Sequence, residues 1–214
     1  ALIDPELTFS LPPGVTASTG MDALTQCIEP FVSNRANPVT DALCREGITR
    51  GGRSLRLAHD QPEHAGARRD MALTALFGGM ALANAKLGAV HGFAAPIGGM
   101  FNAPHGAVCA ILLPSVMETN IHALRERSPE HEALARYSEI ARMLTGNVNA
   151  TAEDGAEWVR QLVTDLAIPG LAAYGVTEDA VPEIVEKAAK ASSMQGNPLP
   201  LTGEELDQIL KSAI

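Results

Sequence analysis

Asp22, Gln26, His91 and His105 are the residues whose types and spacing suggest chemistry. Asp22 and Gln26 are four residues apart in a segment with helical periodicity, so both side chains share one helix face and offer oxygen to one point. His91 and His105 each precede a glycine in an apolar context, where a buried imidazole must satisfy both ring nitrogens. Two histidines and a carboxylate form a common catalytic metal set.

Structural roles also fit these four residues. Asp22 stands in the first turn of its expected helix, where an acidic side chain interacts favourably with the helix dipole. An Asp four residues before a Gln is commonly a solvated or capping pair. His91 and His105 can both be core histidines bonded to the backbone. The residues taken alone therefore leave a metal site and a structural role both open.

The elements that must position these residues are helices. Residues 1–17 are rich in turn formers and are expected to form an extended lead-in, followed by a helical domain over residues 18–214. Residues 67–89 are mostly small and apolar, which predicts a helix buried on most of its faces. Residues 88–106 are rich in glycine and proline and precede an apolar stretch over 107–117. The other expected helices span roughly 21–33, 38–58, 128–144, 151–166, 177–192 and 202–213.

No segment shows the alternation typical of a strand, so the sequence predicts an all-α domain. Thr151 with Asp154, and Thr202 with Glu205, fit capping boxes at two helix starts. No glycine-rich phosphate loop of the GxGxxG or GxxxxGK[ST] type follows a strand. The chain is therefore expected to have no nucleotide phosphate site of its own.

Composition narrows the class of protein further. The 214 residues are 46% hydrophobic and 19% charged, and the net charge is −9. This acidic balance argues against a nucleic acid or an anionic membrane as the main partner. No apolar run reaches the roughly 18 residues that span a bilayer, and residues 1–10 lack a signal-peptide pattern. The three cysteines, Cys27, Cys44 and Cys109, show no CxxC spacing, so we expect buried, reduced thiols and a cytoplasmic setting.

Several motifs in order resemble the iron-containing (group III) alcohol dehydrogenase family. They are the run 20–25 (GMDALT), Glu29, the pair 91–92 (HG), the run 104–106 (PHG) and the run 112–114 (LLP). The lead-in 3–7 and the tail 196–198 are similar to the family as well. The resemblance implies the family's C-terminal, dehydroquinate-synthase-like helical domain. The family's N-terminal α/β nucleotide-binding domain is missing from this sequence, which suggests that the chain is part of a longer protein.

The resemblance also implies a metal site. Asp22, His91 and His105 match three of the family's four ligand positions, and Gln26 stands where the family usually has the first of its three histidines. Gln26 is therefore a fourth candidate ligand, harder and weaker than imidazole; alternatively the site is three-coordinate with water, or empty. Ala95 stands where many members have a further histidine that is proposed to relay a proton. We therefore assign no catalytic base and no cofactor-binding residue.

The implied activity is hydride transfer between an alcohol or aldehyde and NAD or NADP. A divalent metal, iron or zinc, would polarise the substrate oxygen. The dinucleotide would need the missing domain, so the chain alone is expected to be inactive. Expected partners are a small-molecule alcohol or aldehyde and either a second copy or a nucleotide-binding domain, but no nucleic acid or membrane. The alternatives are a stand-alone helical interaction module with a degraded metal site, a maleylacetate-reductase-like enzyme and a dehydroquinate-synthase-like enzyme.

Overall fold

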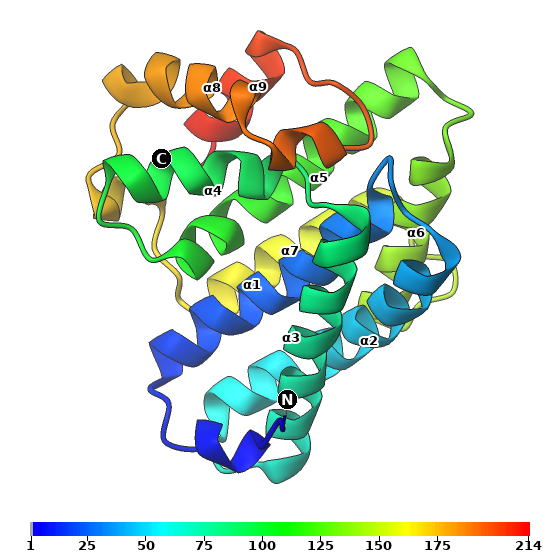
Figure 1. Cartoon of the computed structure of the whole chain (residues 1–214), viewed down its shortest axis with the longest axis vertical. Helices are drawn as coiled ribbons and strands as arrows, with labels where there is room; N and C mark the ends of the chain where they lie inside the picture. Colours follow the sequence, from blue (N-terminus) through cyan, green and yellow to red (C-terminus); the bar gives the residue numbers. More distant parts are fainter. Residues whose placement is uncertain (1) are drawn as a thin grey trace.

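The computed structural model describes residues 2–214, and within that range the chain is helical with no β-strand (Figure 1). This confirms the all-α prediction. Four short 3₁₀ turns, at Pro5–Thr8, Leu171–Tyr174, Glu178–Ala180 and Ser193–Gly196, accompany the α-helices. The α-helices are α1 (Pro13–Val32), α2 (Pro38–Asp60), α3 (Ala65–Ala85), α4 (Ala89–Met100), α5 (His105–Arg127), α6 (Glu132–Thr145), α7 (Ala152–Asp165), α8 (Val181–Lys190) and α9 (Gly203–Lys211).

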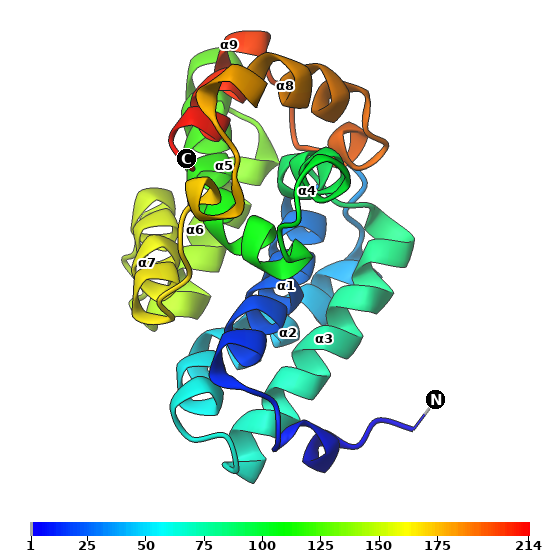
Figure 2. The same cartoon turned by 90° about the vertical axis from the view of Figure 1, so that its left-hand side faces the viewer.

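Helix α1 is central to the packing, because it contacts α2, α3, α5 and α6. Its side chains Met21, Leu24, Ile28 and Phe31 are all essentially inaccessible to solvent. Helices α2 and α3 pack beside α1 in one half of the molecule, and α8 and α9 lie across the opposite end next to α4 and α5 (Figures 1 and 2). Because α1 has neighbours on several sides, some of its residues fill the core while others can contribute to a site between helices.

Helix α1 begins at Pro13, inside the segment that was expected to be an extended lead-in up to residue 17. The prediction that residues 13–17 are extended is therefore wrong. Pro13 occupies the start of the helix, where proline has no N–H to lose and its fixed φ already suits the helix. Pro30 does not end the helix, which continues to Val32. Residues 12–14, which are typical of turns, thus form the N-cap and the first two residues of the helix.

Helix α3 is not buried on most of its faces, contrary to the expectation from its small apolar composition. Leu76, Met80 and Leu82 are each more than a third exposed. The small residues instead allow α3 to approach α1 closely on one side. A Cβ at Gly78 would press against Gln26 and the backbone oxygen of Ala23, both on α1. The helix ends at Ala85, and Lys86 follows with a positive φ of 61°.

The glycine- and proline-rich segment after α3 forms helix α4, which the sequence did not predict. Its apolar face, formed by Val90, Phe93, Ala94 and Ile97, is fully buried in the common core. Tertiary burial therefore overrides the weak helix propensity of Gly92, Pro96, Gly98 and Gly99. Phe93 belongs to this core and does not line an open pocket.

The later helices agree with the prediction to within a few residues. The capping boxes of Thr151 with Asp154 and of Thr202 with Glu205 are both present at the starts of α7 and α9. Helix α5 is long and apolar enough to pass a length-and-hydropathy test for a membrane span, but 78% of the tested window is buried inside the fold. It packs against α1, α4 and α7, as expected of a core helix.

Asp70 joins α2 to α3 through a buried carboxylate. It accepts hydrogen bonds from Arg50 Nη1 at 2.7 Å, Arg53 Nε at 2.8 Å and Ser54 Oγ at 2.7 Å. Burial alone would raise the pKa of Asp70, but the bonds from Arg53, Ser54 and Arg50 outweigh it and lower the pKa to about 2. Because the folded-state pKa is depressed, this stabilisation is present above the unfolded pKa and is lost as the pH falls towards 2.

We therefore expect Asp70→Asn to lower the free energy of unfolding at neutral pH by on the order of 2 kcal/mol. The variant should also lose stability less steeply than the wild type on acidification from about pH 5. Urea denaturation followed by circular dichroism at several pH values measures both effects. Asp207→Asn is the matched control, because Asp207 pairs with Lys211 on the surface and such pairs contribute little. Equal effects of the two variants would contradict the assignment.

Candidate metal centre

Helix α1 carries Asp22 and Gln26 on one face, as the four-residue spacing predicts. The Gln26 amide donates from Nε2 to Asp22 Oδ1 at 3.1 Å. The neighbours Met21 and Leu24 point into the core, so Asp22 lies at the border between the core and a partly open face. The side chain of Asp22 is 22% exposed.

His91 lies in the first turn of α4 and is held by a buried carboxylate from α1. Its Nδ1 is 2.6 Å from Glu29 Oε2, and Glu29 Oε1 accepts the Val90 N–H at 2.7 Å. The other ring nitrogen, Nε2, faces Asp22 Oδ1 at 3.3 Å. A carboxylate on one imidazole nitrogen fixes the ring orientation and leaves the other nitrogen as an acceptor, the usual arrangement behind a metal-ligating histidine. Glu29 entered the sequence analysis as part of a motif, and the structure gives it this positioning role.

His105 is the first residue of α5 and approaches Asp22 from the opposite side. Its Nε2 is 3.8 Å from Asp22 Oδ1, and its ring centroid is 5.3 Å from that of His91. The start of α5 can come this close to α1 because the next residue is Gly106. A Cβ at Gly106 would overlap with the carbonyl oxygen of Ser18, one turn before Asp22. About half of the His105 side chain is exposed, so this is the open side of the site.

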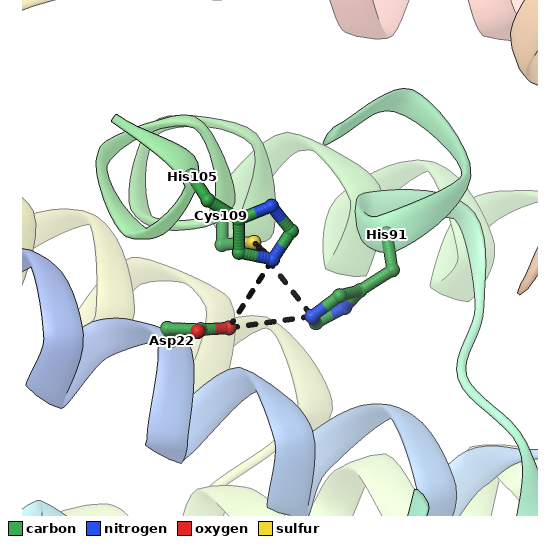
Figure 3. A group of neighbouring side chains, drawn as sticks. All are labelled: Asp22, His91, His105 and Cys109. Atoms are coloured by element: carbon green, nitrogen blue, oxygen red, sulfur yellow. Dashed lines mark hydrogen bonds and ion pairs between the residues drawn. The ribbon is translucent and has the colours of Figure 1, made fainter. Parts of the chain in front are cut away.

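Cys109 completes the cluster, and the sequence analysis missed it. Cys109 Sγ is 3.6 Å from His105 Nε2 and 3.8 Å from His91 Nε2 (Figure 3). Cys109 is inaccessible to solvent, which confirms that it is buried as predicted. The missed signal was the i, i+4 spacing from His105, which places both side chains on one helix face. Ligand atoms of Asp22, His91, His105 and Cys109 all lie within 4.8 Å of one another.

The cluster shifts the pKa values of its members strongly. Burial disfavours a charged His91, but Glu29 and Asp22 outweigh it and raise the pKa of His91 far above its ordinary value. Burial raises the pKa of Asp22, and the hydrogen bond and charge of His91 reverse that effect, so that the pKa is lowered overall. Burial raises the pKa of the Cys109 thiol to about 11, against the opposing effect of His91. Without a cation, the carboxylates are thus stabilised by proton binding on His91.

The donor set suits a divalent cation. Imidazole nitrogen, carboxylate oxygen and thiolate sulfur are all established ligands of zinc and similar metals. Their ligand atoms lie within 4.8 Å of one another, close enough to converge on one ion, and Glu29 supplies the outer partner that such a histidine needs. Ala95, one turn beyond His91 on α4, is exposed and has no side chain that could carry a proton.

Within residues 2–214, carboxylate and imidazole groups from three helices of an all-helical domain converge on one point and could hold a metal ion. Comparison with known proteins identifies the family. The profile described as "Fe-containing alcohol dehydrogenase family, C-terminal" matches residues 16–214. The chain belongs to the iron-containing alcohol dehydrogenase family, which confirms the resemblance seen in the sequence.

Individual relatives agree with this assignment. Alcohol dehydrogenase 4 of Schizosaccharomyces pombe is 40% identical over 99% of this chain and 48% of the relative. The 1,3-propanediol dehydrogenase of Klebsiella pneumoniae is 36% identical over 98% of this chain and 54% of the relative. The crystal structure of a 1,3-propanediol oxidoreductase superposes with a TM-score of 0.90 at 36% identity, covering 99% of this chain and 55% of that one. The chain therefore spans about half the length of the relatives it matches, the C-terminal half of the family architecture.

The contact between Gly106 and Ser18 gives a prediction about the site. We expect Gly106→Ala to displace the start of α5 and with it His105 and Cys109, because the new methyl group overlaps with a backbone oxygen. The free energy of unfolding should fall by about 1–3 kcal/mol, and binding of added Zn²⁺ should weaken strongly. Isothermal titration calorimetry and urea denaturation measure the two effects.

Gly99→Ala on α4 is the matched control, because a Cβ there meets no neighbouring atom. It should stabilise the protein by roughly 0.5–1 kcal/mol, as glycine-to-alanine changes inside helices do, and leave Zn²⁺ binding unchanged. Unaltered Zn²⁺ binding in Gly106→Ala would show that the close approach of α5 to α1 does not position the cluster.

Proposed function

We propose that this chain is the metal- and substrate-binding half of a NAD(P)-dependent alcohol dehydrogenase. The observation that carries the proposal is the convergence of Asp22, His91 and His105 from three helices upon one point. Family membership supplies the reaction class, since the relatives are dehydrogenases by name. The names of the relatives include a methanol and a long-chain-alcohol dehydrogenase, so we propose an alcohol or aldehyde as the substrate class.

The proposed ligands are Asp22, His91 and His105, and Gln26, beside Asp22, is one candidate for the fourth position. A divalent metal bound there, iron or zinc, would act as a Lewis acid on the substrate oxygen. Asp22 would contribute negative charge to offset the cation, and Glu29 would hold His91 with Nε2 directed to the cluster. The half-exposed side at His105 is where a substrate oxygen would enter, because the opposite side is closed by the buried groups of α4 and α5.

The dinucleotide would be bound by a second domain. Nothing in residues 2–214 forms the strand and glycine-rich turn that hold a pyrophosphate. One relative is named an NAD-dependent methanol dehydrogenase, and a solved sulfoacetaldehyde reductase of similar structure is described in complex with NAD⁺. We therefore propose NAD or NADP as the hydride carrier. The chain alone should not transfer hydride, and it should act in the cytoplasm, docked to a nucleotide-binding domain or assembled with a second copy.

A different class of function competes with this proposal. Gln26 and Ala95 stand where the family usually has histidines, which favours a stand-alone helical interaction module whose metal site has decayed. A maleylacetate-reductase-like or dehydroquinate-synthase-like enzyme would keep the metal but act on another substrate. Metal content separates the interaction module from both enzymes, and substrate assays of the protein with its nucleotide-binding half separate the enzymes.

The first test is metal binding. We expect the purified protein to bind one divalent metal ion per chain, and we expect His91→Ala to weaken binding by at least about 100-fold, more than the loss of an outer-shell partner costs. Elemental analysis by mass spectrometry and calorimetric titration with Zn²⁺ or anaerobic Fe²⁺ measure this. His122→Ala is the control, because His122 is largely exposed and pairs only with Glu126. A well-folded protein that binds no metal would favour the interaction module.

Gln26 provides a second prediction. We expect Gln26→His to raise the affinity for a divalent transition metal by at least about tenfold, because imidazole is a stronger ligand than a neutral amide. The Gln26 amide already lies against Asp22 Oδ1, so the new ring would start next to the other donors. Competition titration with a metal-sensitive dye measures the change. Unchanged or reduced affinity would mean that position 26 does not reach the metal.

A further inference from the structure

We propose that Cys109 is a metal ligand through its sulfur, so that the donor set of this chain is one carboxylate, two imidazoles and one thiolate. The inference rests on the metal site of the proposed function and adds to it a residue and a metal preference. Cys109 does not stand alone, because Asp22 and His91 reach the same point from two other helices. The His91 side chain among them is only 6% exposed and is aimed into the cluster.

The donor atoms of the cluster are spaced closely enough to share one ion. A tetrahedral metal with bonds of about 2.0–2.1 Å to nitrogen or oxygen and about 2.3 Å to sulfur sets its ligand atoms roughly 3.3–3.6 Å apart. Cys109 Sγ lies 3.6 Å and 3.8 Å from the two histidine nitrogens. Asp22 Oδ1 lies 3.3 Å and 3.8 Å from the same two atoms. The sulfur is therefore placed as well for one shared ion as the carboxylate is.

The Cys109 thiol faces more hydrogen-bonding groups than it can satisfy. A thiol has one proton and is a weak donor, so it can satisfy only one of the two imidazole nitrogens that face it. In the neutral ring, His91 Nε2 is an acceptor when Nδ1 donates to Glu29. In the protonated ring, which the metal-free cluster favours, Nε2 donates to Asp22 Oδ1 and leaves the thiol with His105 alone as an acceptor. One cation between sulfur and nitrogens satisfies all of them at once. On binding, the Cys109 thiol and the protonated His91 ring would each lose one proton to solvent. The charges of the Asp22 carboxylate and the thiolate would then balance a divalent ion.

Gln26, the other candidate for the fourth position, turns its amide nitrogen and not its oxygen to Asp22. Its amide presents Nε2 to Asp22 Oδ1 at 3.1 Å, and an amide N–H group donates hydrogen bonds but does not ligate metals. Gln26 in this orientation steadies the carboxylate from outside. Cys109, in contrast, is fully buried and directed to both imidazoles.

A thiolate changes which metal the site prefers. Soft sulfur ligands favour zinc or cobalt over magnesium or manganese, and they strengthen the preference for zinc over ferrous iron. The half-exposed side at His105 leaves room for a fifth ligand, so four protein ligands remain compatible with substrate binding.

The test uses cobalt as a spectroscopic probe. We expect the Co²⁺-loaded protein to show a near-ultraviolet thiolate-to-cobalt charge-transfer band, which Cys109→Ser and Cys109→Ala should both abolish. Zn²⁺ affinity should fall at least about tenfold in both variants. Cys44→Ala is the matched control, since Cys44 is an equally buried cysteine on α2 outside the cluster; it should keep the band and the affinity. Circular dichroism of the metal-free variants checks that each one folds.

A double variant sharpens the test. Gln26→His combined with Cys109→Ala should recover Zn²⁺ affinity, because an imidazole replaces the lost donor, but it should not recover the charge-transfer band. If the wild type binds Co²⁺ without that band and Asp22→Ala abolishes binding, the metal site exists and Cys109 is not a ligand. If no variant and no wild-type protein binds metal, the proposed function fails as well.

Discussion

The buried carboxylate of Glu29 holds the two parts of the site together. It lies on the central helix α1, and its two oxygens accept the Val90 N–H at the start of α4 and contact Nδ1 of His91. A carboxylate that is 4% exposed is costly unless such partners satisfy it. The start of α4, and with it the His91 ring, is therefore tied to α1. Gly88 makes room for this contact, because a Cβ there would lie 3.0 Å from Glu29 Oε1.

A second buried polar group extends this constraint to the C-terminal part of the chain. Asn197 Oδ1 accepts the Ala89 N–H at 3.2 Å, and Asn197 Nδ2 donates to Asn120 Oδ1 on α5 at 2.7 Å. Asn120 in turn donates to the hydroxyl of Tyr137 on α6. Segments that are far apart in the sequence thus satisfy one another's buried hydrogen-bonding groups. This network specifies one arrangement of α4 and α5. On the other side, Gly106 lets α5 meet the backbone of α1.

The site could be predicted from the sequence only in part. The residue types and the motif order singled out Asp22, Gln26, His91 and His105, and the structure places these side chains close together. That they bind a metal stays a prediction. Cys109 was not predicted to belong to the cluster. It follows His105 by four residues and so lies on the same helix face, but nothing in the local sequence indicates that this face of α5 is turned towards α1. Residue types suggest donors, whereas the choice between a buried hydrophobe and a ligand depends on which helices face each other.

The sequence by itself determined the helical class, most helix positions from α2 onwards, the capping boxes and the family. The helices and their caps are local properties, because periodicity and capping act over one or two turns, and the family follows from the order of short motifs along the chain. Only the tertiary structure decided that glycine-rich residues 89–100 are helical and that α3 leaves Leu76 and Met80 exposed. It also decided that four donor atoms from three helices meet. Each of these outcomes depends on which distant segments pack against one another, and where such packing buries a helix it overrides local propensity.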